Sequence, residues 1–566
     1  MTDEKKLVFL PLGGVGEIGL NCYLYGQDGR WMMVDLGIGF ADDRLPGAEI
    51  LLPDLSFIRE QRDRLAGLVL THAHEDHLGA VPYLWQELGC PVWCTAFAAA
   101  VLRRKFDDMQ REHPRPLQVV EPGQPFEVGP FACRLLHVTH SIPEANALAI
   151  ESAHGRLLHT GDWKLDREPL IGEATDVPGI EEFAAEGVLA LVGDSTNVLV
   201  AGTAGSEAEV RDSLTELIRA KPHRVAVTTF ASNVARLETA AHAGRDAGRE
   251  VVVVGRSMWR MIEAARNCGY LRDLPPLLDE IEARSLPRNR VLYLVTGSQG
   301  EPRSALMRIA MGQHARVRLE PGDTVIFSSK IIPGNERTLF NLHNQLVDLG
   351  VEVITEEDHF VHVSGHPCRE DMEQMYRWVR PRIAVPVHGE ARHLHAHARF
   401  ARELGVPETV LLKNGHLLCI APDGPRVLDE VPVGRLALEN GDLVPEASDL
   451  FRARRRIMQH GVISVGLVLD AYGSVMAPPA VANVGSVEPE RFERLQERLE
   501  EALTRAIEAL EDEVVMNDER VCEAARVTVR QTLGLSRHKR PVIEVQVTRL
   551  TPESLTALEE DSVGVR

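Results

Sequence analysis

The sequence contains a dense run of side chains that can bind metal ions. His72, His74, Asp76 and His77 fall within six positions. Neutral imidazoles with carboxylates, and without thiolates, suit zinc, manganese or iron in open catalytic sites better than a closed structural zinc site. The spacing lets His72 and His74 bind one ion together, and Asp76 and His77 a second. A loop with solvated histidines is the alternative, but crowding so many imidazoles would cost charge repulsion without structural gain.

The elements that flank this run predict how it is positioned. Residues 67–70 are apolar and indicate a short buried strand, and residues 78–85 read as the start of a helix. The run therefore lies on a strand-to-helix loop, where one turn of backbone can aim the four side chains at one point.

The pattern H-x-H-x-D-H after a strand resembles the signature of the metallo-β-lactamase superfamily. The resemblance implies that Asp35, which closes the strand 31–34, is a structural aspartate. It also implies further metal ligands, each after an apolar run, as expected if ligands gather at one end of a sheet sandwich. The implied ligand sets are His72, His74 and His140 for one metal, Asp76, His77 and His388 for the other, and Asp162 as a bridge.

The wide gap between Asp162 and His388 predicts a large insertion. Asp194, His366 and His388 resemble the three motifs of the β-CASP insertion of nucleic-acid-processing enzymes. A histidine at the third motif is typical of members that act on RNA rather than DNA. With the opening segment 10–19 and a C-terminal appendage, the chain resembles the bacterial ribonuclease J family. The resemblance implies a metal-dependent 5′-to-3′ exonuclease that prefers RNA with a 5′-monophosphate, has endonuclease activity, and serves RNA maturation and decay.

The resemblance also implies roles for individual residues. Asp76, Asp194 and His366 are the implied catalytic residues: Asp76 orients or deprotonates the attacking water, and His366 stabilises the transition state or protonates the leaving 3′-oxygen. The implied cofactors are two divalent ions, Zn²⁺ or Mn²⁺, with Mg²⁺ as a further candidate. RNA is the implied partner, together with a homodimer or homotetramer formed through the C-terminal domain; no RNA-degradation partner is indicated.

A second group of residues resembles the pocket that this family uses for an RNA 5′-monophosphate. Hydroxyls, an amide, an imidazole and the start of a helix can together cradle a phosphate. A Ser-Asn pair before a helix is also an ordinary N-cap, so the pair by itself indicates less. The pocket residues are Ser232, Asn233, His362 and Ser364.

Composition bounds the class of protein. The 566 residues are 44% hydrophobic and 26% charged, and no apolar run is long enough to span a bilayer. No signal-peptide pattern precedes the first strand, and the eight scattered cysteines fit buried thiols, so we expect a cytoplasmic protein without a membrane partner. The net charge of -21 argues against RNA as a partner, although two dications and local arginines could make the cleft positive.

The pattern of strands and helices predicts the domain organisation. Repeated apolar strands with intervening helices predict a buried parallel sheet between residues 203 and 365. The expected fold is α/β: a metallo-β-lactamase αββα sandwich with an inserted β-CASP α/β domain and a small C-terminal α/β domain. The predicted boundaries are 1–202 and 366–440 for the sandwich, 203–365 for the insertion, 441–456 for a linker and 457–556 for the C-terminal domain, with strands at 462–469, 474–476 and 542–547.

Three alternatives accompany this interpretation. Residues 14–19 match G-x-G-x-x-G, but a dinucleotide fold needs a helix next, and residues 22–25 and 31–34 predict a hairpin instead. A hydrolase of small substrates on the same fold is disfavoured, because small substrates do not require a second domain across the cleft. A catalytically silent RNA-binding scaffold would not need an intact ligand set.

Overall fold

The computed structural model describes residues 6–534 and 540–550. These residues form two compact units. One comprises the chain up to Phe40 together with Glu49–Leu443, and the other comprises Ala41–Ala48 and the residues from Val444 onward. Among the described helices, none is both long and apolar enough to cross a membrane.

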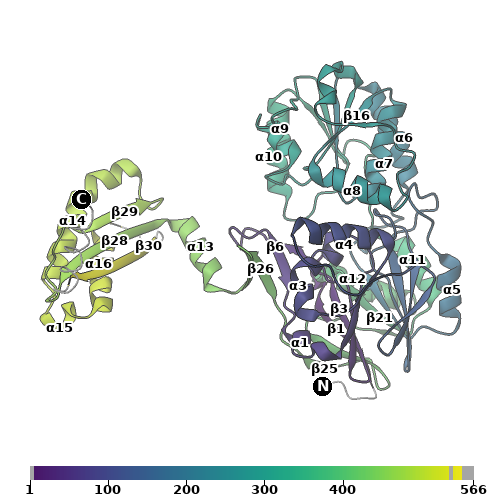
Figure 1. The fold of residues 1–566 in the computed structure, drawn as a ribbon, viewed down its shortest axis with the longest axis horizontal. Coiled ribbons are helices and arrows are strands. Elements are labelled where there is room, and N and C mark those ends of the chain that lie inside the picture. Colours follow the sequence, from purple (N-terminus) through teal and green to yellow (C-terminus); the bar gives the residue numbers. More distant parts are fainter. Residues whose placement is uncertain (1–5, 535–539, 551–566) are drawn as a thin grey trace. The chain divides into compact units, whose positions relative to one another are not determined.

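Two mixed sheets packed face to face form the larger body of the first unit (Figure 1). Phe9 and Tyr25 of one sheet and Leu148 and Ile150 of the other belong to the apolar layer between them. In spatial order, the first sheet is β25 (Arg426–Glu430), β24 (His416–Ala421), β1 (Leu7–Gly13), β3 (Cys22–Gln27), β4 (Arg30–Val34), β7 (Leu65–Val69), β8 (Val92–Cys94) and β9 (Leu117–Val119). The second is β10 (Pro125–Val128), β11 (Phe131–His137), β12 (Asn146–Ser152), β13 (Gly155–His159), β14 (Ala190–Asp194), β21 (Ile383–Val387) and β23 (Glu408–Thr409).

Helices cover the outer face of each of these sheets. The first sheet is covered by α1 (Ser56–Arg59), α3 (Val81–Leu88) and α4 (Ala96–Asp108), with the short α2 (Glu75–Leu78) at its edge. The second is covered by α5 (Val177–Ala185), α11 (Arg369–Val379) and α12 (Ala391–Glu403), of which α5 and α11 are seen at the right of the body in Figure 1. The predicted αββα sandwich is confirmed, because an amphipathic helix buries its apolar stripe best against a sheet face.

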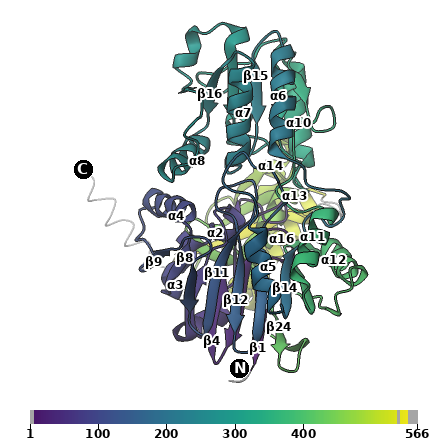
Figure 2. The same ribbon diagram turned by 90° about the vertical axis from the view of Figure 1, so that its right-hand side faces the viewer.

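A separate six-stranded sheet lies within residues 203–365, and its neighbouring strands all run parallel (Figure 2). Its strands in spatial order are β17 (Leu277–Leu278), β16 (Glu250–Val254), β18 (Val291–Val295), β15 (Val225–Thr228), β19 (Thr324–Phe327) and β20 (Glu352–Ile354). Its helices are α6 (Glu207–Ala220), α7 (Val234–Asp246), α8 (Arg256–Asn267), α9 (Ala305–Ala310) and α10 (Glu336–Asp348). The chain leaves the adjacent strands β15 and β19 in opposite directions, and such a switch point forms a ligand crevice at the carboxyl ends of the strands.

Two small sheets complete the strands outside the C-terminal region. One pairs β2 (Val15–Gly16) with β22 (Gly389–Glu390), and the other joins β27 (Asp442–Pro445), β26 (Arg435–Glu439), β6 (Ile50–Pro53) and β5 (Gly39–Phe40). Short 3₁₀ helices lie at Arg62–Arg64, Glu282–Ser285 and Arg288–Arg290.

The second unit is a small α/β body. Its sheet has the order β29 (Ala480–Val484), β28 (Val462–Asp470) and β30 (Val542–Leu550), and α14 (Pro489–Glu508) and α16 (Asp518–Thr532) pack on it. Its other helices are α13 (Asp449–His460) and α15 (Asp512–Val515). The stretch predicted as a linker therefore contains β27 and part of α13. The predicted end at residue 556 lies outside the described residues.

One predicted strand of this unit is wrong. Residues 474–476 make only an isolated bridge, between Leu469 and Val475, and the strand that pairs with β28 begins at Ala480. The cause is local: the Asp470 carboxylate accepts hydrogen bonds from the backbone N–H groups of Tyr472 and Ser474, which hold these residues in a turn.

The G-x-G-x-x-G segment does not lead into a helix. The strands β3 and β4 that follow pair as an antiparallel hairpin, as the sequence predicts. Gly14 has a φ of 82°, and a Cβ atom there would collide with the Tyr23 hydroxyl. Its carbonyl accepts the backbone N–H of His388 at 2.7 Å, so the segment supports the candidate metal centre rather than a dinucleotide.

Candidate metal centre

The predicted ligands lie beyond the carboxyl ends of strands in the two facing sheets. The H-x-H-x-D-H run follows β7, His140 follows β11, Asp162 follows β13 and His388 follows β21. Because β13, β14 and β21 are parallel neighbours, their carboxyl ends meet at one edge of the sheet. Residues more than 300 positions apart are thus brought together.

Three imidazoles form the first ligand cluster. His74 Nδ1 lies 3.1 Å from His72 Nε2 and 3.0 Å from His140 Nε2. The His140 ring is fixed from behind, because its Nδ1 donates to the Gly365 carbonyl at 2.6 Å and leaves Nε2 as a lone pair. Together with Asp162, these side chains place one ligand atom each within 4.8 Å of one another.

Asp35 fixes the orientation of ligands in both clusters. Its carboxylate accepts the Thr71 backbone N–H and hydroxyl, each at 2.8 Å, and the Nδ1–H of His77 at 2.7 Å. Because the only hydrogen of the Thr71 hydroxyl is used, its oxygen must accept from His72 Nδ1 at 3.0 Å. His72 and His77 therefore both direct a lone pair on Nε2 toward the centre, the tautomer that a metal ligand needs.

The second cluster combines Asp76, His77, Asp162 and His388, again with ligand atoms within 4.8 Å. Asn21 organises it: Nδ2 donates to the Asp76 carbonyl at 3.0 Å, and Oδ1 lies 3.0 Å from His388 Nδ1. The Tyr23 hydroxyl donates to the same Oδ1 at 2.7 Å. His388 Nε2 is thereby left as a buried nitrogen without a hydrogen-bond partner.

Asp162 is the member that the two clusters share. It is 2% exposed, and its Oδ2 lies 3.2 Å from His77 Nε2, 3.9 Å from His72 Nε2 and 4.0 Å from His140 Nε2. Its Oδ1 has no hydrogen-bond partner. A buried carboxylate oxygen without a partner is costly, so the position suits a group that bridges two cations.

The backbone is strained at two of these positions. Asp35 has a φ of 60° and His388 a φ of 51°, in the left-handed region that L-residues rarely adopt. Such conformations cost about 1–3 kcal/mol each and persist where the surrounding structure enforces them, typically at functional sites. Here both side chains are aimed at the clustered ligands.

The donor set fits divalent cations. Burial and the neighbouring imidazoles hold the pKa of His72 and His140 well below the usual value, and burial lowers that of His74 to about 4, so these rings are neutral donors. Around His77, burial opposes a proton, but the carboxylates of Asp162 and Asp76 outweigh it and raise the pKa. The second cluster therefore favours positive charge, which a metal ion would supply in place of the proton on His77 Nε2. In the first cluster the ring nitrogens converge at 3.0–3.1 Å, an arrangement that suits ligation of one cation.

The predicted catalytic pair lies beside these clusters. His366 Nδ1 donates to Asp194 Oδ2 at 2.8 Å, and the other oxygen of Asp194 accepts the Thr196 backbone N–H at 2.9 Å. Burial disfavours a charged ring, but the carboxylates of Asp194 and Asp162 raise the pKa of His366 to about 9. His366 also lies 3.8 Å from Asp162 Oδ2, so a protonated imidazole stands next to the shared carboxylate.

The four pocket residues come from two segments of the inserted domain. Asn233 is the N-cap of α7, where its Oδ1 accepts the Arg236 backbone N–H at 2.8 Å, and Ser232 is half-buried beside it. The segment lies at the switch point after β15. Ala235, the second residue of the helix, donates its backbone N–H to the carbonyl oxygen of Ser141, one residue beyond His140. The start of α7 is thus linked to the first ligand cluster.

Ser364 and His362 lie on the segment that leads into His366. The Ser364 hydroxyl oxygen accepts hydrogen bonds from Asn197 Nδ2 at 2.7 Å and from the His366 backbone N–H at 3.1 Å. The hydrogen of the hydroxyl is not used in either bond. His362 and His366 are four residues apart, which limits the distance between their Cα atoms to about 14 Å. This segment connects the pocket with the ligand clusters.

Several residues of the site carry no signal in the sequence. Asn21 lies between the G-x-G-x-x-G segment and β3, and its role depends on contacts with residues 55 to 367 positions away. Arg236 is an ordinary arginine of a helix by its sequence, yet it is fully buried against the pocket. His159, the last residue of β13, lies 2.9 Å through Nδ1 from the Tyr25 hydroxyl and belongs to neither ligand cluster.

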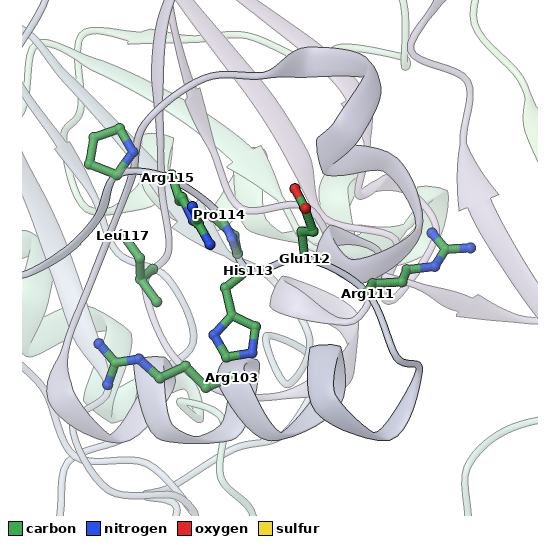
Figure 3. A pocket seen from close by; sticks show the side chains of 8 residues that line it. Arg103, Arg111, Glu112, His113, Pro114, Arg115 and Leu117 are labelled. Atoms are coloured by element: carbon green, nitrogen blue, oxygen red, sulfur yellow. The ribbon is translucent and has the colours of Figure 1, made fainter.

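A hollow elsewhere on the sandwich is not the metal centre. It has a volume of about 450 Å³ and lies at the carboxyl end of α4 (Figure 3). Its lining is Arg103, Arg111, Glu112, His113, Pro114, Arg115, Pro116 and Leu117. None of the clustered ligands lines it, and its guanidinium groups would repel a metal cation.

Comparisons with known proteins agree with this geometry. Family models match as follows: "Metallo-beta-lactamase superfamily" over residues 15–228, "Ribonuclease J, beta-CASP domain" over 222–346, "Zn-dependent metallo-hydrolase RNA specificity domain" over 350–411 and "Ribonuclease J C-terminal domain" over 450–550. A ribonuclease J of Sinorhizobium meliloti is 42% identical over 97% of this chain and 98% of its own length. The chain belongs to the ribonuclease J family. A ribonuclease J of Mycolicibacterium smegmatis is 38% identical over 94% of this chain and 95% of its own length, and one of Synechocystis is 35% identical over 87% and 78%.

Membership of the ribonuclease J family confirms the predicted class of enzyme. The protein is a metal-dependent ribonuclease with a metallo-β-lactamase domain, an inserted β-CASP domain and a ribonuclease J C-terminal domain. The two alternatives, a hydrolase of small substrates and a silent scaffold, are thereby set aside. RNA is the substrate, and the clustered histidines and aspartates provide for divalent metal ions.

Proposed function

We propose that this ribonuclease removes nucleotides from the 5′ end of RNA, prefers a 5′-monophosphate, and also cuts RNA internally. The observation that carries the proposal is the segment from His362 to His366. Its first residues contribute to the candidate phosphate pocket, and its last residue pairs with Asp194 beside the metal ligands. A 5′-phosphate held at one end of this segment would place the first phosphodiester bond at the other end.

The pocket suits a terminal phosphate by its chemistry. The Ser364 and Ser232 hydroxyls can donate, and the N-terminal end of the α7 dipole favours an anion. The first backbone N–H groups of α7 already donate to Ser232, Ser141 and Asn233, so the helix contributes through its dipole. Most of these groups are neutral, so they recognise a phosphate by geometry rather than by net charge. RNA that threads past the pocket without occupying it would be cut internally.

We assign two divalent ions, Zn²⁺ or Mn²⁺ with Mg²⁺ as a further candidate, to the two clusters. His72, His74 and His140 would hold one, Asp76, His77 and His388 the other, and Asp162 would bridge them. When bound, such a pair supplies an acidified water and stabilises the charge that develops on the phosphoryl group.

The other steps belong to side chains of the chain. Asp76 is partly exposed beside the second cluster and can orient the attacking water or take its proton. His366, which Asp194 holds protonated, can donate its proton from Nε2 to the leaving 3′-oxygen. At neutral pH, Asp76 would thus act as the general base and His366 as the general acid.

The remaining expectations stay predictions. They are the domain boundaries, a homodimer or homotetramer formed through the C-terminal domain, and a cytoplasmic location. The eight cysteines are all unpaired thiols, as a reducing compartment requires. Sedimentation of the purified chain with and without residues 457–556 tests the role of the C-terminal domain in assembly.

The deciding experiment supplies the purified protein, loaded with Mn²⁺ or Zn²⁺, with RNA that carries a 5′-monophosphate and a label at either end. A 5′-triphosphorylated twin and the variant His77→Ala run alongside. We expect labelled mononucleotide from the 5′ end, faster from the monophosphate and absent with the variant. Internal fragments alone, formed at the same rate from both RNAs, would refute the pocket.

A further inference from the structure

A buried arginine lies directly behind the candidate phosphate pocket. Arg236, in the first turn of α7, is 0% exposed. Its Nε and Nη2 donate to both oxygens of Glu207, at 3.0 and 2.7 Å. Its Nη1 donates to the carbonyl oxygens of Ser328 and Val361, at 2.9 and 3.1 Å. A guanidinium held from so many sides has a fixed position.

The same Nη1 lies 3.2 Å from Nδ1 of His362. Nη1 also donates to the Ser328 hydroxyl oxygen at 2.8 Å, so its two hydrogens are shared among four acceptors. Because a guanidinium has no lone pair to offer, His362 Nδ1 faces it as an acceptor and carries no proton. The ring is therefore neutral and protonated on Nε2. Within the described part of the chain, this is the only hydrogen bond of the His362 side chain, which leaves its Nε2–H to donate to a ligand.

We propose that Arg236 is a positioning residue that holds His362 as the neutral Nε2–H tautomer, which donates to the 5′-phosphate of RNA. This inference rests on the proposed phosphate pocket and deepens it. Without Arg236, the Nδ1–H tautomer, the more strongly hydrated imidazolium and other ring orientations become accessible, and the pocket loses a preorganised donor.

The electrostatic surroundings of His362 agree with a neutral ring. Burial together with the positive charges of Arg236, Lys330 and Lys164 holds its pKa well below the usual value. Glu207, 4% exposed, balances the charge of Arg236, so the arginine acts on His362 without adding net charge to the pocket. His362 therefore offers the phosphate a hydrogen-bond donor of fixed direction, its Nε2–H, rather than a positive charge.

The arginine is itself anchored to the loop of the bridging carboxylate. Glu207 is the first residue of α6, and its backbone N–H donates to Asp166 Oδ2 at 3.1 Å. The carboxylate of Asp166 in turn accepts a hydrogen bond from Nζ of Lys164 at 3.0 Å, and Lys164 lies two residues after Asp162. A continuous set of buried charged groups therefore joins the pocket to the metal-binding loop. Both sites are held in one frame, which an enzyme that cuts a fixed distance from the RNA end requires.

The tautomer can be measured in the unaltered protein. Proton-detected ¹⁵N spectra of the protein with labelled histidine distinguish the two imidazole nitrogens, and His362 is the resonance lost in the variant His362→Gln. We expect a neutral ring with the proton on Nε2. A proton on Nδ1, or an imidazolium at neutral pH, would overturn the proposal whatever the variants do.

The effect on recognition is measured with paired substitutions that leave no unbalanced buried charge. Affinity for 5′-monophosphorylated and 5′-hydroxyl RNA is compared in the background His366→Gln, which slows hydrolysis. We expect Arg236→Met with Glu207→Gln to reduce the preference for the monophosphate by about 10- to 100-fold, as for loss of an oriented hydrogen bond to a charged group.

The chain offers a matched control between the same two helices. Arg211 of α6 pairs with Glu238 of α7 at 3.0 Å but does not touch His362. Arg211→Met with Glu238→Gln should keep the preference. If both double variants keep it while the parent protein prefers the monophosphate, the pocket stands and the role of Arg236 fails. If the parent protein itself shows no preference, the proposed pocket fails and the role assigned to His362 fails with it.

Discussion

The Asp35 carboxylate lies 2.7 Å from Nδ1 of His77 and accepts a hydrogen bond from its Nδ1–H. Asp35 follows β4 and His77 lies in α2, the short helix after β7, and the contact fixes His77 with Nε2 toward the second cluster. The same carboxylate holds Thr71, which in turn orients His72 in the first cluster. One residue that is not a ligand thus sets ligand geometry for both candidate metals.

Asp35→Asn is therefore expected to weaken metal binding without removing a ligand. Loss of such a carboxylate partner typically costs 10- to 100-fold in metal affinity or activity. Titration with Zn²⁺ and Mn²⁺ by calorimetry measures the change. Asp28→Asn is the control, since Asp28 has a similar φ of 52° but is exposed on the neighbouring hairpin. Equal affinities for both variants would contradict the role of Asp35.

His366→Gln is expected to lower kcat by about 10²–10⁴-fold, the range for loss of a positioned general acid. Metal content and the affinity for RNA should stay close to those of the parent protein, because the other ligands of both clusters remain. Single-turnover cleavage with metal analysis of the same samples tests this. His359→Gln, at an exposed histidine seven residues before His366, is the control. A parallel loss of bound metal would show that His366 is a ligand instead.

Gly365→Ala is expected to disturb the first cluster through one contact. A Cβ atom at Gly365 would lie 2.7 Å from Cε1 of His140, whose ring is fixed by the Gly365 carbonyl itself. We expect weaker binding of the first metal and slower cleavage, with the second cluster retained. Gly434→Ala is the control, because its nearest neighbour would lie at 3.9 Å. Unchanged occupancy by two metals, measured by elemental analysis, would refute the prediction.

The buried pair of Glu207 and Arg236 makes stability depend on pH. Burial alone would raise the pKa of Glu207, but the charge and hydrogen bonds of Arg236 outweigh it and hold the pKa below its usual value. A carboxyl group with a lowered pKa in the folded state stabilises above its unfolded pKa, about 4.3, and this stabilisation is lost as pH falls through the folded value.

Glu207→Gln should accordingly destabilise by about 3–5 kcal/mol at neutral pH, because it leaves a buried guanidinium unpaired. The difference from the parent protein should shrink below about pH 4. Urea unfolding across this range measures it. Glu216→Gln, an exposed position of the same helix, should have no such effect. A difference that is constant with pH would mean that the ion pair does not contribute.

Much of the ligand set follows from the sequence alone. His72, His74, Asp76 and His77 lie on one short segment that runs from the end of β7 into α2, and so short a segment after a buried strand leaves little choice about where they point. The alternation of apolar strands and helices likewise determines the parallel sheet of the inserted domain, because burial of both faces requires continuous apolar runs. Both features depend on neighbours in the chain, which a sequence displays.

Other features were decided by contacts between distant segments. The sequence resemblance assigns Asp162 to a bridge, but only the pairing of β13 with β14, and of β14 with β21, brings its carboxylate between two groups of imidazoles. The strand predicted at 474–476 does not form, because the Asp470 carboxylate binds backbone N–H groups and holds the chain in a turn. The pattern of apolar residues does not show this local competition.

The protonation pattern of the site could come only from the tertiary structure. Asn21 and Arg236 belong to an unremarkable hairpin and helix by their sequence, yet they set the hydrogen bonds of His388 and His362. A tautomer depends on which donor or acceptor lies within about 3 Å of each ring nitrogen. That distance is fixed by how sheets and helices pack, whereas the metal-binding side chains can be identified from the sequence alone.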